Sequence, residues 1–199
     1  MIIIGGGGHA SVVLDCLNAM RVHVTSIFDS QNAGDLMGVP RIKSYQPDMF
    51  PDAHALVAIG DNGVRKRVVQ TVKHAFINVI HPSALISDSV QLGVGNMIIH
   101  RAIVQARTVI GNHIIINTGA QIDHDCVLGD FVHVAPGAVL CGAVTVGEGV
   151  LIGAGAVIIP GISIGAGATV GAGAVVRQNV SEHAVVVGNP ARVIKKKNA

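Results

Sequence analysis

A six-residue repeat fills the second half of the chain and restricts the possible folds more than any other feature. Every sixth residue from Ile80 to Val176 is Ile, Leu or Val, without exception. The position after it is often Gly, and the fifth position is often Ala, Thr or Cys. This pattern is typical of a short strand and a tight corner, with the aliphatic side chain inside and small residues at the corner. Three such units close one coil, so we predict a mainly β solenoid of parallel coils over residues 80–181.

Composition agrees with a stacked repeat and excludes two classes of partner. Half the residues are hydrophobic, but only 3% are aromatic and 25 are Gly. With a net charge of +2 and no basic stripe, nucleic-acid binding is not expected. Residues 149–176 carry no charge and resemble a membrane span by hydropathy alone. Their many glycines, Pro160 and the six-residue period argue against a helix, so no membrane insertion is expected.

The cysteines and the first residues of the sequence predict a cytoplasmic protein. Cys16, Cys126 and Cys141 show neither paired nor metal-like spacing, so free thiols in a reducing compartment are expected. The first residues lack the basic segment of a secretory signal. Residues 182–199 are interpreted as a C-terminal tail. Its Lys195–Lys197 run is either frayed and solvated or a contact to a phosphorylated ligand.

Residues 1–79 show alternating strand and helix patterns and predict a small Rossmann-like α/β domain. The expected elements are strands at 1–4, 22–28, 55–59 and 76–80, and helices at 10–20 and 64–74. A glycine loop, Gly5–Gly8, stands between the first strand and the first helix, where backbone N–H groups can approach a phosphate. Asp29 ends the second strand and can accept hydrogen bonds from a ribose.

The ligand of this domain stays open between three interpretations. The glycine spacing does not match a full dinucleotide fingerprint, and the domain is about half the size that NAD needs. A nucleotide or nucleotide-sugar is the preferred ligand. A glycine turn that only reverses the chain is the remaining alternative.

The segment from Asn117 to His133 concentrates polar and ionisable groups in an otherwise apolar repeat. Acyl transfer from a thioester needs a base near neutral pKa and a donor to the thioester oxygen. His124 fits the base, and Asp123 or Asp125 can orient it. Either His133 or a backbone N–H near Gly142 can supply the donor.

Simpler interpretations of the same residues remain. His124 can be an ordinary surface histidine. A metal site of His124, Asp125 and His133 matches no common ligand spacing. Cys141 lies one residue from the position that stacks on His124, so an acyl-cysteine is conceivable, although a buried structural thiol is the simpler interpretation.

Four motifs together resemble a known family, the bacterial sugar O- and N-acetyltransferases with hexapeptide repeats. This family includes sialic-acid O-acetyltransferase and the UDP-bacillosamine-pathway and perosamine N-acetyltransferases. The motifs are Ile-Gly-Gly-Gly-Gly-His at 4–9, Ala-Ile-Gly-Asp-Asn at 58–62 with Arg65-Lys66, the segment 117–133, and Val-Gly-Asn-Pro-Ala-Arg at 187–192. The resemblance implies a left-handed parallel β-helix, acetyl-CoA as co-substrate, and a homotrimer with sites between neighbouring solenoids. No metal is expected, because the ligand spacing fits no common site.

The resemblance also implies roles for individual residues. His124 corresponds to the base and Asp125 to its acidic neighbour. Acetyl-CoA contacts are implied for His133, Gly142, Ala154 and Ala172. Substrate contacts are implied for Gly7, Gly8, His9, Asp29, Ser30, Gly60, Asn62 and Asn117. Ala10 follows His9 where many relatives have another Gly.

The function expected from these observations is acetyl-CoA-dependent N-acetylation of a nucleotide-linked 4-amino-4,6-dideoxy sugar in bacterial surface-glycan biosynthesis. The amine would attack acetyl-CoA directly while His124 takes its proton. Two alternatives stay open: O-acetylation of a sugar such as sialic acid, and a non-catalytic solenoid scaffold.

Overall fold

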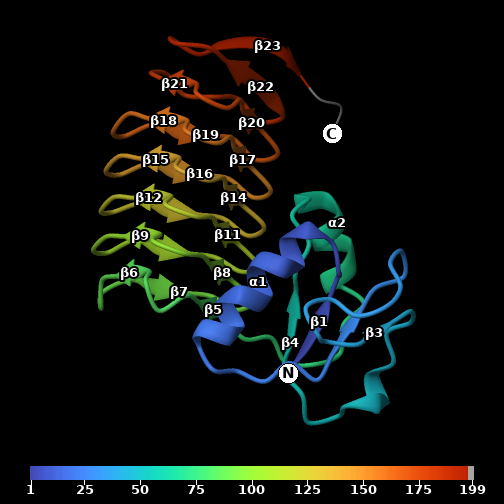
Figure 1. Ribbon diagram of the computed structural model, residues 1–199. Helices are drawn as coiled ribbons and strands as arrows, with labels where there is room; N and C mark the ends of the chain where they lie inside the picture. Colours follow the sequence, from blue (N-terminus) through green and yellow to red (C-terminus); the bar gives the residue numbers. More distant parts are fainter. Residues whose placement is uncertain (197–199) are drawn as a thin grey trace.

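The computed structural model describes residues 1–196, which form a small α/β unit packed beside a tall β-solenoid (Figure 1). The α/β unit contains a parallel sheet with strand order β3-β2-β1-β4. Its elements are β1 (Ile2–Ile4), α1 (Gly8–Ala19), β2 (Ser26–Phe28), β3 (Arg41–Ile42), a 3-10 turn (Pro47–Met49), β4 (Ala55–Val57) and α2 (Asn62–Val69). Central β1 pairs with β2 on one side and β4 on the other. The expected parallel α/β arrangement is therefore present.

Several element boundaries differ from the sequence prediction. The strand expected from Val22 begins only at Ser26, because Arg21 takes a left-handed φ of 58° and ends α1 in a turn. Helix α2 ends at Val69, and both the backbone N–H and the hydroxyl of Thr71 donate to the Val68 carbonyl. Phe76 makes only an isolated bridge to Ala55. β3 was not expected, since a two-residue strand is too short to show periodicity.

The solenoid has three sheets, parallel except for β23, which we name by position. The docking face contains β5 (Val79–Ile80), β8 (Met97–Ile98), β11 (Ile115–Ile116), β14 (His133–Val134), β17 (Leu151–Ile152), β20 (Thr169–Val170), β22 (Ala184–Val187) and β23 (Arg192–Lys196). The second face contains β6 (Leu85–Ile86), β9 (Ile103–Val104), β12 (Gln121–Ile122), β15 (Val139–Leu140), β18 (Val157–Ile158) and β21 (Val175–Val176). The third face contains β7 (Gln91–Leu92), β10 (Val109–Ile110), β13 (Val127–Leu128), β16 (Thr145–Val146) and β19 (Ser163–Ile164).

The repeat positions form the axis of this prism, as predicted. Ile116 pairs with Val134, Ile122 with Leu140, and Ile110 with Leu128, so residues eighteen apart stack on every face. These aliphatic side chains are buried in one continuous core. Burial of apolar surface stabilises the stack at roughly 25 cal/mol per Å².

Between the faces run three corner columns, each a ladder of tight turns. The His124 corner joins the second and third faces at residues 105–108, 123–126, 141–144 and 159–162. The Ala154 corner joins the docking and second faces at residues 117–120, 135–138, 153–156 and 171–174. The Phe131 corner joins the third and docking faces at residues 111–114, 129–132, 147–150 and 165–168. In a triangular prism the His124 corner is therefore opposite the docking face.

The α/β unit covers the lower docking face through an apolar contact. Outward-facing Met97 and Ile115 share a buried cluster with Leu14 and Leu17 of α1. Higher on this face the outward residue of β14 is His133. The change from aliphatic residues to histidine marks where packing gives way to a polar site.

The upper coils and the C-terminal end complete the solenoid. Residues 149–176, the apolar segment, form coils that include β17 to β21, and no helix within residues 1–196 is long and apolar enough to cross a membrane. Strand β23 pairs antiparallel with β22, so Lys195 and Lys196 are exposed on a strand and are not frayed. Lys197 lies outside the described residues.

Candidate active site

His124 stands at its corner as the exposed end of a hydrogen-bonded chain of three side chains. Its Nδ1 lies 2.6 Å from Oδ2 of Asp125, and 54% of its side chain is exposed. Arg107, one coil below, donates from Nε to Asp125 Oδ1 and from Nη2 to Asp125 Oδ2, both at 2.7 Å. The hydrogen bond from Arg107, followed by that from His124, holds the pKa of Asp125 well below its usual range. An ionised carboxylate only accepts, so Nδ1 carries a proton and Nε2 is left as a base.

Gly142 lies one coil above His124 and leaves space for the histidine ring. A Cβ on Gly142 would lie 2.7 Å from both Cε1 and Nε2 of His124, a distance that real Cβ atoms do not show. At this corner Cys141 N donates to Ile158 O and Ala143 N donates to His124 O. Within residues 1–196 we find no hydrogen bond from Gly142 N–H, which leaves that donor next to the histidine. This geometry favours the Gly142 N–H over His133 as the donor to the thioester oxygen.

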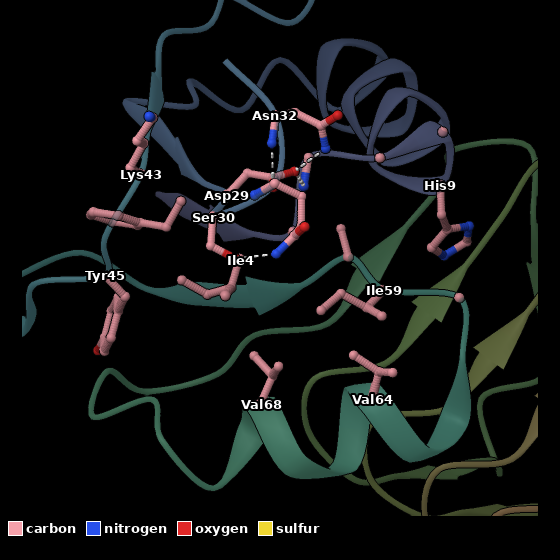
Figure 2. A pocket seen from close by; sticks show the side chains of 18 residues that line it. Ile4, His9, Asp29, Ser30, Asn32, Lys43, Tyr45, Ile59, Val64 and Val68 are labelled. Carbon is pink, nitrogen blue, oxygen red and sulfur yellow. Dashed lines mark hydrogen bonds between the residues drawn. The ribbon is translucent and has the colours of Figure 1, made fainter. Parts of the chain in front are cut away.

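A cavity of about 520 Å³ lies in the α/β unit between the glycine loop, the end of β2, the end of β4 and α2 (Figure 2). Six of the predicted substrate residues line it: Gly7, Gly8, His9, Asp29, Ser30 and Gly60. Its floor is apolar, with Ile4, Ile59, Val64 and Val68. Figure 2 shows Lys43 and Tyr45 at the end of the cavity away from His9. An elongated cavity with an apolar floor and a glycine loop suits a nucleotide.

Asp29 holds the glycine loop in shape. Its Oδ2 accepts from Gly6 N at 2.6 Å and from Asn32 Nδ2 at 2.8 Å, and its Oδ1 accepts from Gln31 N and Asn32 N. Burial acts to raise the pKa of Asp29, but these hydrogen bonds, led by that of the Asn32 side chain, lower it overall. Four donors already occupy the carboxylate, so a ribose hydroxyl would have to replace one of them.

His133 joins the cavity to the solenoid. Its Nδ1 lies 3.2 Å from Gly60 O, and its Nε2 lies 3.2 Å from Asn117 Nδ2. The His9 ring centroid is 6.3 Å away. Burial and then the charge of Arg65 lower the pKa of His133 to about 4. Burial, His133 and Arg65 likewise lower the pKa of His9 to about 4. Both imidazoles are therefore neutral near pH 7.

Asn62 lies outside the cavity, although it was predicted among the substrate residues. Its Nδ2 donates to Gly149 O at 3.0 Å and Val150 O at 3.1 Å, and its Oδ1 accepts from Arg65. Asn62 thus fastens α2 to the Phe131 corner. Its direct contact with substrate stays a prediction.

The remaining predicted residues fall on two different corners of the prism. Ala154 and Ala172 stack eighteen residues apart on the Ala154 corner, which also carries Asn117. Gly142 lies with His124 on the corner opposite the docking face. Within residues 1–196 no hydrogen bond joins Cys141 Sγ to His124, and no group of three or more His, Cys, Asp and Glu could hold a metal ion.

Sequence reasoning missed Arg107 and Lys43 and gave Arg65 no role. Arg107 could have been found, because it lies eighteen residues before Asp125 and must stack beneath it. Lys43 and Arg65 carry no comparable signal, since their positions depend on how the α/β unit folds and docks.

Comparisons with known proteins identify the family. Residues 1–72 match the PglD N-terminal domain, and residues 143–178 match the bacterial transferase hexapeptide model. A histidine variant of perosamine N-acetyltransferase from Caulobacter crescentus, solved with CoA and GDP-perosamine, is 39% identical to this chain and has a TM-score of 0.95. The match covers 98% of this chain and 96% of that one.

The chain belongs to the hexapeptide-repeat family of sugar acetyltransferases. The acetyltransferase domain of PglB from Neisseria gonorrhoeae, solved with acetyl coenzyme A, is 34% identical, with a TM-score of 0.90 over 97% of this chain and 98% of that one. UDP-N-acetylbacillosamine N-acetyltransferase of Bacillus subtilis (strain 168) is 40% identical over 106 residues, 48% of this chain. That match spans about half, 49%, of the curated relative's length. The predicted family and fold class, a left-handed parallel β-helix after a small Rossmann-like domain, are confirmed.

Proposed function

We propose that the protein is an acetyl-CoA-dependent N-acetyltransferase for a nucleotide-linked 4-amino-4,6-dideoxy sugar, acting in bacterial surface-glycan biosynthesis in the cytoplasm. The observation that carries this proposal is the His124–Asp125–Arg107 chain on a solenoid that matches a CoA and GDP-perosamine complex along nearly its whole length. The cavity beside the glycine loop supports a nucleotide as the handle of the acceptor.

The geometry suits direct transfer without an acyl-enzyme. The sugar amine attacks the thioester carbon, and Nε2 of His124 takes the proton that the amine loses. Asp125 stabilises the imidazolium that forms. The N–H of Gly142 donates to the thioester oxygen as it becomes negative. The C–S bond then breaks, and His124 returns the proton to the CoA thiolate.

A complete site requires more than one copy of the chain in this proposal. His124 and Gly142 lie on the corner opposite the docking face, whereas the cavity, His133 and the Ala154 corner lie on or beside that face. A homotrimer would place the His124 corner of one copy against the Ala154 corner and cavity of the next, and closed three-fold symmetry would make all three sites equal.

The test is an assay of CoA release against UDP- and GDP-linked 4-amino sugars and free sialic acid, with mass spectrometry of the product and light scattering of the protein. An amide product with a nucleotide-linked amino sugar and a trimeric mass are expected. Transfer only to a hydroxyl of free sialic acid would replace this proposal with O-acetylation. No CoA release from any acceptor, together with no thermal shift at saturating CoA, would leave only a scaffold.

A further inference from the structure

Arg65, on α2, is fully buried where the α/β unit meets the solenoid, and its guanidinium bonds only neutral acceptors. Nε donates to His113 O at 2.9 Å, and Nη1 donates to Ile59 O at 2.9 Å and Gly60 O at 3.1 Å. Nη2 donates to Asn62 Oδ1 at 2.8 Å and Phe131 O at 2.9 Å. Every branch of the guanidinium is therefore used, and within residues 1–196 it makes no salt bridge.

These acceptors belong to the α/β unit and to the solenoid, so Arg65 links the two across their junction. The Ile59 and Gly60 carbonyls follow β4 in the α/β unit. The His113 and Phe131 carbonyls are eighteen residues apart and stack on the Phe131 corner. The planar Arg65 guanidinium bonds carbonyls of the α/β unit and of the solenoid, so it fixes the position of the Gly60 carbonyl along the solenoid axis.

The position of the Gly60 carbonyl selects the tautomer of His133. The Gly60 carbonyl, which accepts from Arg65, also lies 3.2 Å from His133 Nδ1. A carbonyl only accepts, so Nδ1 carries the ring proton and a neutral ring leaves Nε2 as an acceptor. Asn117 is oriented to match, because its Oδ1 accepts from Thr118 N at 2.8 Å and its Nδ2 faces His133 Nε2.

Electrostatics act in the same direction. Charged or titratable groups reach His133 from two elements, His9 from α1 and Arg65 from α2, and Asn117 on the neighbouring coil is uncharged. Burial and the Arg65 charge lower the pKa of both histidines. The α1 N-terminus next to His9 also disfavours an imidazolium there.

We propose that Arg65 is a positioning residue for acetyl transfer: it holds the Gly60 carbonyl against His133 Nδ1, so that Nε2 is an acceptor. Asn117 Nδ2 occupies this acceptor in the protein without substrates, and a substrate N–H group takes its place on binding. This rests on the proposed function. Two N–H groups fit, the attacking amine of the sugar and an amide of the pantetheine arm. Because Nε2 of His133 then accepts and does not donate, the Gly142 N–H alone donates to the thioester oxygen.

The first test uses the wild-type protein without substrates, so it does not depend on activity. Two-bond ¹H–¹⁵N correlation spectra of ¹⁵N-histidine-labelled protein at pH 7 report the tautomer of each ring, and the resonance lost in His133→Gln assigns His133. A neutral ring with the proton on Nδ1 is expected. A proton on Nε2, or an imidazolium, would overturn the proposal even if acetyltransferase activity is confirmed.

The second test separates positioning from simple interface strength. Arg65→Lys keeps the charge, but one ammonium cannot span the Gly60 and Phe131 carbonyls. Roughly a three- to tenfold rise in one KM is expected, in the range of one lost hydrogen bond. A rise for acetyl-CoA identifies the pantetheine amide as the donor, and a rise for the nucleotide-sugar identifies the amine.

Lys66→Ala is the matched control. It removes the Lys66–Glu148 ion pair across the same junction without touching the Arg65 bonds, so both KM values should stay unchanged. Equal KM values in folded Arg65→Lys and wild type would refute the proposal. If Arg65→Lys does not fold, His133→Leu decides: it should raise one of the two KM values, and His133→Gln, whose amide oxygen can accept, should restore that KM in part. No change in His133→Leu would also refute the proposal.

Discussion

His124 and His133 lie nine residues apart on the same solenoid, yet their surroundings differ in charge and in exposure. His124 is exposed, and its Nδ1 meets the carboxylate of Asp125, which Arg107 holds in place. His133 is half-buried, meets a neutral carbonyl and an amide, and lies near a buried guanidinium. An adjacent carboxylate stabilises an imidazolium, whereas burial beside a cation excludes one.

These surroundings determine which of the two histidines can take up a proton. A general base must be able to become positively charged during the reaction, and only the His124 environment permits that. His133 and His9 are suited to binding as neutral hydrogen-bonding groups.

The largest effect is expected from removing the base. His124→Ala should lower turnover by about 10²–10⁴-fold, because general-base catalysis contributes that much, and CoA release under saturating substrates measures it. Folding should be unchanged, since the side chain is exposed. His54→Ala, which removes an exposed histidine without an assigned role, is the control. Near-normal turnover in His124→Ala would end the assignment of this residue as the base.

Mixed trimers test whether each site draws on two copies of the chain. Subunits with His124→Ala supply an intact cavity, and subunits with His9→Ala supply an intact base corner. If each site draws on two copies, refolding the two variants together should give more activity than either variant alone, because some sites then combine an intact cavity with an intact base corner. Mixtures no more active than either variant alone would place the whole site within one chain.

A smaller effect is expected from crowding the base. In Gly142→Ala the added Cβ would lie 2.7 Å from the His124 ring, so the ring must move away from its present position. Misplacing a reacting group by about 1 Å can cost on the order of 100-fold in rate, and the loss should appear in kcat. Gly63→Ala, whose Cβ would make only ordinary contacts of 3.5 Å and longer, should leave kcat unchanged. A wild-type kcat in Gly142→Ala would show that His124 tolerates a different position.

The smallest expected effect concerns the pH dependence of stability, and it tests whether His9 and His133 are neutral in the folded protein. The pKa values of His9 and His133 fall from 6.5 to about 4 in the folded protein. Between these values the unfolded chain binds protons that the folded chain does not, so stability is present above pH 6.5 and is lost as pH falls toward 4. Each ring contributes a slope of about 1.4 kcal/mol per pH unit in that window.

Urea unfolding at several pH values measures this slope. His81 and His113, whose pKa values are also lowered, act in the same direction. A variant with both His9→Gln and His133→Gln should therefore have a flatter profile than wild type, without becoming flat. An equal slope in the two proteins would mean that His9 and His133 titrate normally and would weaken the contrast with His124.

Much of the solenoid side of the candidate site could be inferred from spacing alone. A stacked coil obeys simple arithmetic: His124 must lie beneath Gly142, and Arg107 must lie beneath Asp125, because each pair is eighteen residues apart. The glycine loop and Asp29 were also found, because a strand, a loop and a helix in succession place them together. Asp29 proved to be occupied by four internal donors, which no local pattern records.

The amino-acid sequence is sufficient to predict the coils, their buried aliphatic axis and the corner that we propose for the base, because contacts between coils recur every eighteen residues. The docking of the α/β unit depends on the folded structure, because the Arg65 and Asn62 side chains donate to backbone carbonyls of distant coils and the Gly60 carbonyl faces the His133 ring. Backbone carbonyls carry no sequence signal. The roles of the two histidines depend on that docking: His133 is enclosed beside a buried cation, and His124, on the opposite corner, stays free to accept a proton.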